Sequence, residues 1–188
     1  MKIGDDNIEK IVIESTKSLL LKYGVKGWNM DELAKECGMS KRTLYKIIGS
    51  KEDLLFRCST DIIATNYKQL KQFLNQDADY FNILDKLSHH IISEINEFVI
   101  SSSKIIKTEY PRIADAIDKQ VEELHQLHLT FFNKGKHEGL LNDNATPKII
   151  VNIIKALMKH NIENSHNQTD FKEKTIEELN FLFKAIRK

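Results

Sequence analysis

Cysteine, proline, glycine and long apolar runs are all scarce in this sequence. Two cysteines, Cys37 and Cys58, are too few for a disulfide framework. A buried thiol is the simpler interpretation of each, and a redox switch is the alternative. Two prolines and seven glycines among 188 residues, of which 41% are hydrophobic, favour an all-α globular protein. There is no run of about eighteen apolar residues and no signal-peptide core, so we expect a soluble cytoplasmic protein without a membrane partner.

The charge of the chain is nearly balanced, but it is unevenly distributed. The formal net charge is +1. Residues 1–60 hold eleven Lys or Arg against nine Asp or Glu, and the positive excess lies after Ser40. A protein that binds duplex DNA needs to be basic only where it contacts phosphate. The residues that follow Ser40 are therefore the first place to look for a nucleic-acid interface.

Residues 40–51 predict a short helix with one apolar and one basic face. Ser40 is a good N-cap, and the apolar positions are three or four residues apart; these are Leu44, Ile47 and Ile48. The cations, with no carboxylate among them, are Lys41, Arg42, Lys46 and Lys51. Thr43 and Tyr45 add hydroxyl groups that can bond phosphate oxygens or base edges. Such a helix is suited to lie against DNA.

A second short helix is predicted directly before this one. Asn29 can cap a helix over residues 30–37, and Gly38 ends it as a glycine after a helix commonly does. Two short helices joined by a tight turn that contains glycine, the second basic at its start, are typical of a helix-turn-helix.

The order of these residues resembles the N-terminal domain of the TetR (tetracycline-repressor-like) transcription regulators. The residues that carry the resemblance are Gly24, Asn-Met-Asp-Glu-Leu-Ala at 29–34, Gly-Met-Ser at 38–40, Thr-Leu-Tyr at 43–45 and Lys-Glu-Asp-Leu-Leu at 51–55. The resemblance implies a three-helix DNA-binding domain over residues 1–50. It also implies a helical bundle for effector binding and dimerisation over residues 51–188.

The function implied is that of a transcriptional regulator, more specifically a repressor. It would bind a palindromic operator in double-stranded DNA as a homodimer and be released by a small-molecule effector. We predict major-groove contacts from Ser40, Lys41, Arg42, Thr43, Tyr45 and Lys46, and phosphate contacts from Lys51, Trp28 and Asn29. For Trp28 the alternative is a hydrophobic staple against the following helix. A helix-turn-helix adaptor that binds DNA but no effector is the alternative function.

Apolar residues at helical spacing predict about nine helices and no sheet. The first is expected from about Asp5 to Tyr23, with an inner face of Ile8, Ile11, Val12, Ser15, Leu19 and Leu20. One hydroxyl of Ser15 or Thr16 is expected to bond back to a helical carbonyl. Later helices are expected at 51–75, at 80–100, at 104–108 after a break at serines 101–103, from Pro111 to a fading end at 135–139, from Pro147, and at 170–187.

The last two helices are apolar on more than one face, which indicates self-association. The predicted dimer interface comprises Ile150, Ile153, Ile154, Leu157, Phe171, Leu179, Leu182 and Phe183. The alternative is that both apolar stripes belong to the core of a monomer. A two-fold dimer would also set the two recognition helices about 34–36 Å apart, one DNA turn.

The middle helices are where the resemblance places an effector cavity. The residues predicted to line it are His90, Glu94, Phe98, Tyr110, His125, His128, Phe131 and Phe132, which suits a mainly apolar small molecule. For His125 and His128 the plainer interpretation is a position that is hydrogen-bonded in the core or exposed at its rim. A metal site on this pair is disfavoured because no Cys is near and the neighbouring carboxylates are Glu122 and Glu123 alone.

Enzymatic interpretations find little support. The sequence has no Gly-x-Ser-x-Gly, no glycine-rich phosphate loop and no His-Glu-x-x-His. We therefore predict no catalytic residue, no metal and no cofactor. The remote alternative is a helical metal-dependent enzyme built on His89, His90, His125 and His128.

Overall fold

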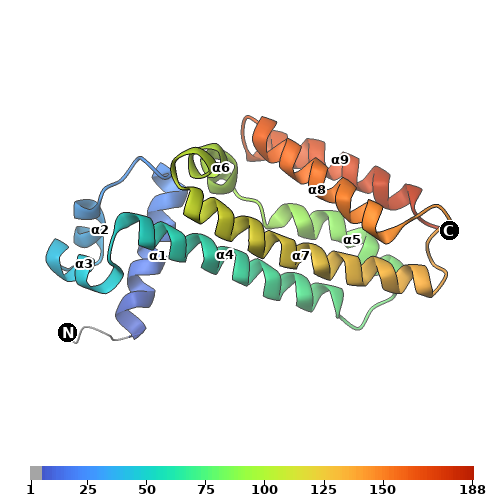
Figure 1. The fold of residues 1–188 in the computed structure, drawn as a ribbon, viewed down its shortest axis with the longest axis horizontal. Coiled ribbons are helices and arrows are strands. Elements are labelled where there is room, and N and C mark those ends of the chain that lie inside the picture. The colour runs from blue at the N-terminus through green and yellow to red at the C-terminus, as the bar shows by residue number, and fades with distance from the viewer. Residues whose placement is uncertain (1–5) are drawn as a thin grey trace.

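The computed structural model describes residues 6–188, and over that range it contains nine α-helices and no strand, which confirms the predicted all-α class (Figure 1). The helices are α1 (Asp6–Tyr23), α2 (Met30–Glu36), α3 (Lys41–Ile48), α4 (Lys51–Leu74), α5 (Tyr80–Ser93), α6 (Glu97–Glu109), α7 (Pro111–His137), α8 (Pro147–Asn164) and α9 (Gln168–Ala185). The predicted start of the first helix at Asp5 lies outside the described residues. None of the described helices is long and apolar enough to span a membrane.

The first three helices form a head at one end of the molecule, and α4 leads from it into an elongated body (Figure 1). α4 packs along α7, α5 packs against α9, and α8 packs against both α7 and α9. α6 lies where head and body meet (Figure 1) and contacts α1, α7 and α8. The long α4 and α7 thus connect the two ends of the molecule.

Two hydrophobic clusters stabilise this arrangement. The head cluster is built from α1 to α4, with Val12, Leu33, Leu44 and Leu54 fully enclosed, and it also takes in Phe98, Ile106 and Ile113 from α6 and α7. The body cluster joins α4, α5, α7, α8 and α9 around Leu84, Leu87, Phe132, Phe171 and Leu179. Because α6 and α7 contribute side chains to the head cluster, a displacement of these helices would change the packing of the head.

Local capping explains where the head helices begin. The Asn29 side chain accepts hydrogen bonds from the backbone of Asp31 and Glu32, and the Glu32 carboxylate accepts one from the backbone N–H of Asn29. This reciprocal capping box satisfies backbone donors that the first turn leaves free. Gly38 follows α2 with φ +63°, a left-handed conformation that favours glycine. The predicted turn between the two helices is thereby confirmed.

The prediction of one helix to about Ile100 followed by a break at serines 101–103 was wrong. α5 ends at Ser93, and α6 begins at Glu97 behind Asn96, whose side chain accepts from Val99 N at 3.1 Å. All three serines lie inside α6, where each hydroxyl donates to a carbonyl three or four residues earlier. A serine that bonds back in this way is tolerated within a helix, whereas Asn96 starts a new one.

The first helix differs from the prediction at one position. Ile11 was expected on the inner face, but 51% of its surface is exposed, and Thr16 is fully buried. Thr16 Oγ1 donates to Val12 O at 2.7 Å, which confirms the expected bond from a hydroxyl to a helical carbonyl. Both cysteines are free, with Cys58 buried and Cys37 half-buried.

Candidate nucleic-acid interface and ligand region

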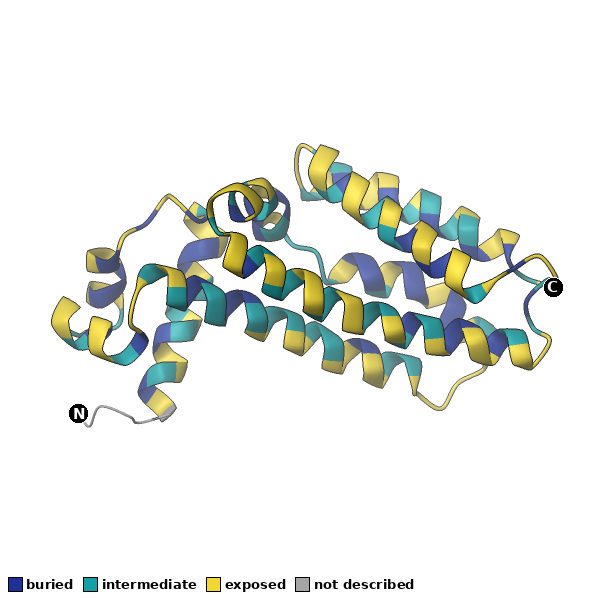
Figure 2. Cartoon of the chain, viewed as in Figure 1, coloured by how far each residue is buried: buried dark blue, intermediate teal, exposed yellow. Residues whose placement is uncertain are grey.

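The recognition helix α3 buries one face and exposes the other. Leu44 and Ile48 are enclosed in the head cluster, at 0% and 1% exposure. Ser40 caps the helix by accepting a hydrogen bond from Thr43 N at 3.1 Å. The outward face is mainly exposed (Figure 2). It carries the exposed Lys41, Arg42, Tyr45 and Lys46 and the half-buried Thr43. The helix is therefore held firmly from behind while its basic side faces solvent.

The cations on this face differ in whether they already have a partner. Lys41 Nζ lies 2.8 Å from Asp31 Oδ2 on α2, and this exposed carboxylate raises the pKa of Lys41 through their hydrogen bond. Arg42 and Lys46 make no ion pair or hydrogen bond within the described residues, and both side chains are exposed. These two side chains are free to meet an anion without first breaking an internal contact.

The residues just before α2 make contacts within the chain itself. Trp28 is 3% exposed, and its indole Nε1 is buried without a hydrogen-bond partner in the described part of the chain. The predicted indole–phosphate contact does not fit this conformation; Trp28 instead packs in the head cluster, as the staple interpretation predicts. Lys51 Nζ donates to Trp28 O at 2.7 Å and lies 4.2 Å from the centre of its ring. Burial lowers the pKa of Lys51.

The N-terminal residues that make up this site match a known family model. The model described as bacterial regulatory proteins, tetR family, matches residues 12–58. Residues 12–58 therefore carry the signature of the TetR family. The matched residues contain α2, α3 and the start of α4, so a TetR-family DNA-binding domain is present and the helix-turn-helix lies at its centre. No curated protein matches the sequence.

Solved structures of TetR-family regulators share the whole fold. A TetR transcription regulator from Haloarcula marismortui ATCC 43049 has a TM-score of 0.83 at 13% identity and covers 98% of this chain and 100% of its own. A TetR-family regulator from Mesorhizobium loti MAFF303099 has a TM-score of 0.73 at 14% identity, with 100% of both chains covered. The regulator FadR from Bacillus subtilis, solved in complex with stearoyl-CoA, has a TM-score of 0.70 at 11% identity and covers 95% and 99%.

The structure divides the eight predicted effector residues into three groups. Phe98 lies in the head cluster, with the half-buried Tyr110 packed against it. Phe131 and Phe132 are enclosed in the body cluster, where the Phe131 ring stacks on Tyr80 with centroids 4.5 Å apart. The polar residues His90, Glu94, His125 and His128 form the third group. The predicted residues therefore do not line a single cavity.

The polar group is joined by two α4 residues that the sequence analysis missed. The ring of Phe73 stacks on that of His90, with centroids 4.3 Å apart and planes inclined by 4°. The Gln69 amide nitrogen, in the orientation that satisfies its hydrogen bonding, donates to both Glu94 carboxylate oxygens at 3.2 and 3.1 Å. Nothing in the sequence near Gln69 or Phe73 signals these contacts, because they depend on how α4 packs on α5.

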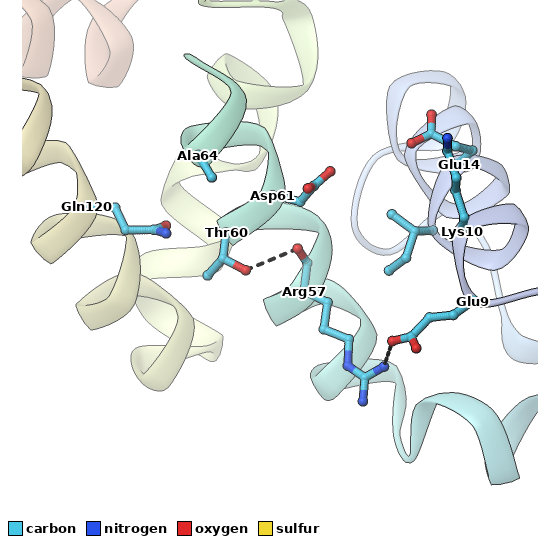
Figure 3. Close-up of a pocket in the computed structure, with 9 residues that line it drawn as sticks. Glu9, Lys10, Glu14, Arg57, Thr60, Asp61, Ala64 and Gln120 are labelled. Atoms are coloured by element: carbon cyan, nitrogen blue, oxygen red, sulfur yellow. Dashed lines mark hydrogen bonds and ion pairs between the residues drawn. The ribbon is translucent and has the colours of Figure 1, made fainter. Parts of the chain in front are cut away.

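An open groove lies elsewhere, between α1, α4 and α7 (Figure 3). Its volume is about 570 Å³, and Glu9, Lys10, Arg57, Asp61 and Gln120 are among the residues that line it. Arg57 and Glu9 form an ion pair across it (Figure 3). None of the predicted effector residues lines this groove. Among the described residues, no group of three or more His, Cys, Asp or Glu side chains could hold a metal ion.

The predicted dimer residues are mostly part of the chain's own core. Those enclosed in the body cluster are Ile150, Ile154, Phe171, Leu179 and Phe183. Leu157 and Leu182 are half-buried, and Ile153 is 38% exposed. The apolar surface of these helices is instead carried by Ile149, 55% exposed, and Phe181, 76% exposed, together with Ile153. Phe181 was missed because it falls outside the apolar stripe of α9.

Proposed function

We propose that this TetR-family protein is a homodimeric repressor that reads a palindromic operator through α3 and is released by a small-molecule effector. The observation that carries the proposal is the free basic face of α3, where Arg42 and Lys46 are exposed and unpaired within the described residues. We assign DNA binding to residues 1–50, and effector binding and dimerisation to residues 51–188. We propose no enzymatic activity.

In this proposal, Arg42 reads a base and Lys46 contacts phosphate. Arginine presents paired donors that match the acceptors of guanine in the major groove, whereas lysine acts as a point charge. The exposed Ser40, Lys41 and Tyr45, with the half-buried Thr43, complete the contact surface. Asn29 and Lys51 act mainly by fixing the corner from which α3 projects.

The exposed apolar side chains of α8 and α9 support the dimer. Ile149, Ile153 and Phe181 expose large apolar surface on the two helices that pack together at the edge of the body. Burying such a surface against a second copy would remove it from water. A two-fold axis through this surface would pair two heads, as a palindromic operator requires.

The polar residues of the body support the effector. Several buried polar atoms between α4, α5 and α7 have no partner within the described residues, and a ligand could supply one. FadR from Bacillus subtilis, which shares the fold, was solved in complex with stearoyl-CoA, so this architecture accommodates a small molecule in at least one protein. Both observations favour an effector-responsive regulator over a DNA-binding adaptor with no effector.

A gel shift tests the proposal. The purified protein is mixed with DNA from immediately upstream of its own gene and with random DNA, each at two salt concentrations. We expect specific, salt-sensitive binding by a dimer. Equal and weak binding to both DNAs would contradict autoregulation through this DNA and favour the adaptor.

A further inference from the structure

Five side chains from three helices form a partly enclosed polar cluster in the body. We call them the histidine cluster: Gln69 of α4, His90 of α5 with Glu94 directly after it, and His125 and His128 of α7. The centroids of the His125 and His128 rings are 6.1 Å apart, and His128 interacts electrostatically with both His125 and His90. Gln69 is exposed, so the cluster reaches solvent along α4.

The cluster contains an unusual number of unsatisfied groups. His128 is 4% exposed, and neither of its ring nitrogens has a hydrogen-bond partner within the described residues. His90 Nε2 and His125 Nδ1 are also buried without a hydrogen-bond partner within the described residues. A buried polar atom without a partner destabilises the fold because it has lost its hydrogen bonds to water. Native proteins keep few such atoms, so several in one place indicate a ligand that supplies the missing partners.

Glu94 indicates which charge that ligand carries. Its side chain is 18% exposed, and burial raises the pKa of its carboxyl group. Its polar neighbours are the neutral Gln69 amide and His90, whose Nε2 lies 3.9 Å from Glu94 Oε1, too far for a hydrogen bond. Burial lowers the pKa of His90, which is therefore neutral at pH 7. No lysine or arginine of the described chain pairs with Glu94, so the carboxylate lacks a countercharge.

We propose that the histidine cluster binds an organic cation with N–H donors on an apolar body, such as an aryl-alkyl amine. The proposal rests on the proposed function, because it names the class of the effector. The ammonium group would pair with Glu94 and donate to the free imidazole nitrogen of His90. The stacked Phe73 and His90 rings would contact the apolar body beside it.

Other ligand classes fit the cluster less well. An anion would face Glu94, and the cation near His125, Lys155, is already paired with Glu122 on α7. A neutral ligand would leave the carboxylate without a countercharge. A metal ion would need a third protein ligand close by, and no such group exists among the described residues.

Three probes of similar size but different charge test the proposal. Isothermal titration calorimetry of the full-length protein at neutral pH is performed with phenylbutylamine, phenylbutanol and phenylvalerate. We expect the amine to bind most tightly. Glu94→Gln keeps the side-chain shape and should weaken amine binding about tenfold or more, while leaving the alcohol unchanged. Glu163→Gln, at an exposed carboxylate paired with Lys107, is the matched control and should bind the amine like the wild type.

A second variant keeps the test decisive if Glu94→Gln does not fold. His90→Phe preserves the stack on Phe73 but removes the imidazole nitrogen, so it should weaken the amine and not the alcohol. Equal affinity for amine and alcohol, unchanged amine binding in both variants, no amine binding at millimolar concentration, or tightest binding of phenylvalerate would each overturn the proposal.

The gel shift separates this inference from the proposed function. Specific operator binding by a protein that does not bind the amine would overturn the inference and leave the DNA-binding role intact. Amine binding that requires Glu94 but does not release the operator would support the site and contradict the effector role assigned to the body.

Discussion

Arg112 Nη1 at the start of α7 lies 3.0 Å from Asp53 Oδ1 at the start of α4. Asp53 also completes the capping box of α4, since its carboxylate accepts from Ser50 N and its backbone N–H donates to Ser50 Oγ. The Ser50 hydroxyl also donates to Asp53 Oδ2 at 2.8 Å, and this hydrogen bond, followed by those from Arg112 and from Ser50 N, lowers the pKa of Asp53. The Asp53 carboxylate, at the start of α4 directly after the recognition helix, therefore forms an ion pair with α7, the long helix of the body.

Asp53 and Arg112 are expected to contribute unequally to stability. Arg112→Met removes only the exposed ion pair and the contact of the guanidinium with the Phe56 ring, 4.7 Å from its centre. Asp53→Asn weakens both the ion pair and the helix cap. We expect Asp53→Asn to lower the urea midpoint more than Arg112→Met, with circular dichroism as the measurement. Equal effects would mean that the capping box adds nothing to the ion pair.

Arg42 and Lys46 are expected to differ in what they contribute to DNA binding. If Arg42 reads a guanine, Arg42→Ala weakens operator binding by about 1–3 kcal/mol and relaxes the preference at one base pair. Lys46→Ala should weaken all sequences alike and reduce the salt slope by about one unit. Fluorescence anisotropy on operator and random DNA at several salt concentrations measures both quantities. An equal loss on both DNAs for Arg42→Ala would contradict the base-reading role.

The head could be predicted from the sequence because its signals are local. A capping residue such as Asn29, a glycine turn and a short amphipathic helix each depend on a few neighbouring residues. The break before α6 was missed for the same reason: Asn96 and the three serines are all capable of capping, and the sequence alone did not decide between them.

The body was harder to interpret because the contacts within the histidine cluster depend on packing between distant segments. The contact of Gln69 with Glu94 joins α4 to the end of α5, and no periodicity encodes it. In α8 the neighbours Ile149 and Ile150 are both apolar, yet one is 55% exposed and the other 2%. Which of two apolar stripes faces the chain's own core is set by the helices packed against it, so the sequence alone did not show which apolar residues of α8 and α9 stay exposed.

His128 is expected to make the protein less stable in mild acid. Burial, with smaller effects of His125 and His90, lowers the pKa of His128 from 6.5 to about 3. The unfolded chain therefore takes up this proton first, so stability is complete above about pH 6.5 and falls as the pH falls toward the folded value. For His128 alone the loss between pH 6.5 and pH 5 is about 2 kcal/mol.

The neighbours of His128 modify this dependence in known directions. The pKa values of His125, lowered to about 4, and His90 shift the same way, whereas the raised pKa of Glu94 opposes them. Lys155, paired with Glu122, also lowers the pKa of His125. Urea unfolding at a series of pH values should show a shallower loss in His128→Leu. The exposed His137→Gln is the control and should keep the wild-type curve; an identical curve for His128→Leu would contradict the prediction.

Phe181 is expected to stabilise the proposed homodimer. Its side chain is 76% exposed on α9, and Ile149 and Ile153 on α8 are also exposed, so the dimer proposed above would bury all three. Phe181→Glu places a charge in that contact without touching the enclosed residues of the body cluster, so each protomer should still fold. Light scattering after size exclusion should report a monomer, and operator binding should weaken because the two heads no longer act together.

Leu21→Glu is the matched control, since Leu21 is 55% exposed on α1 of the head, and it should stay dimeric. A dimeric Phe181→Glu variant would move the interface to another surface, and the pairing of the heads would then have to be explained by a different axis.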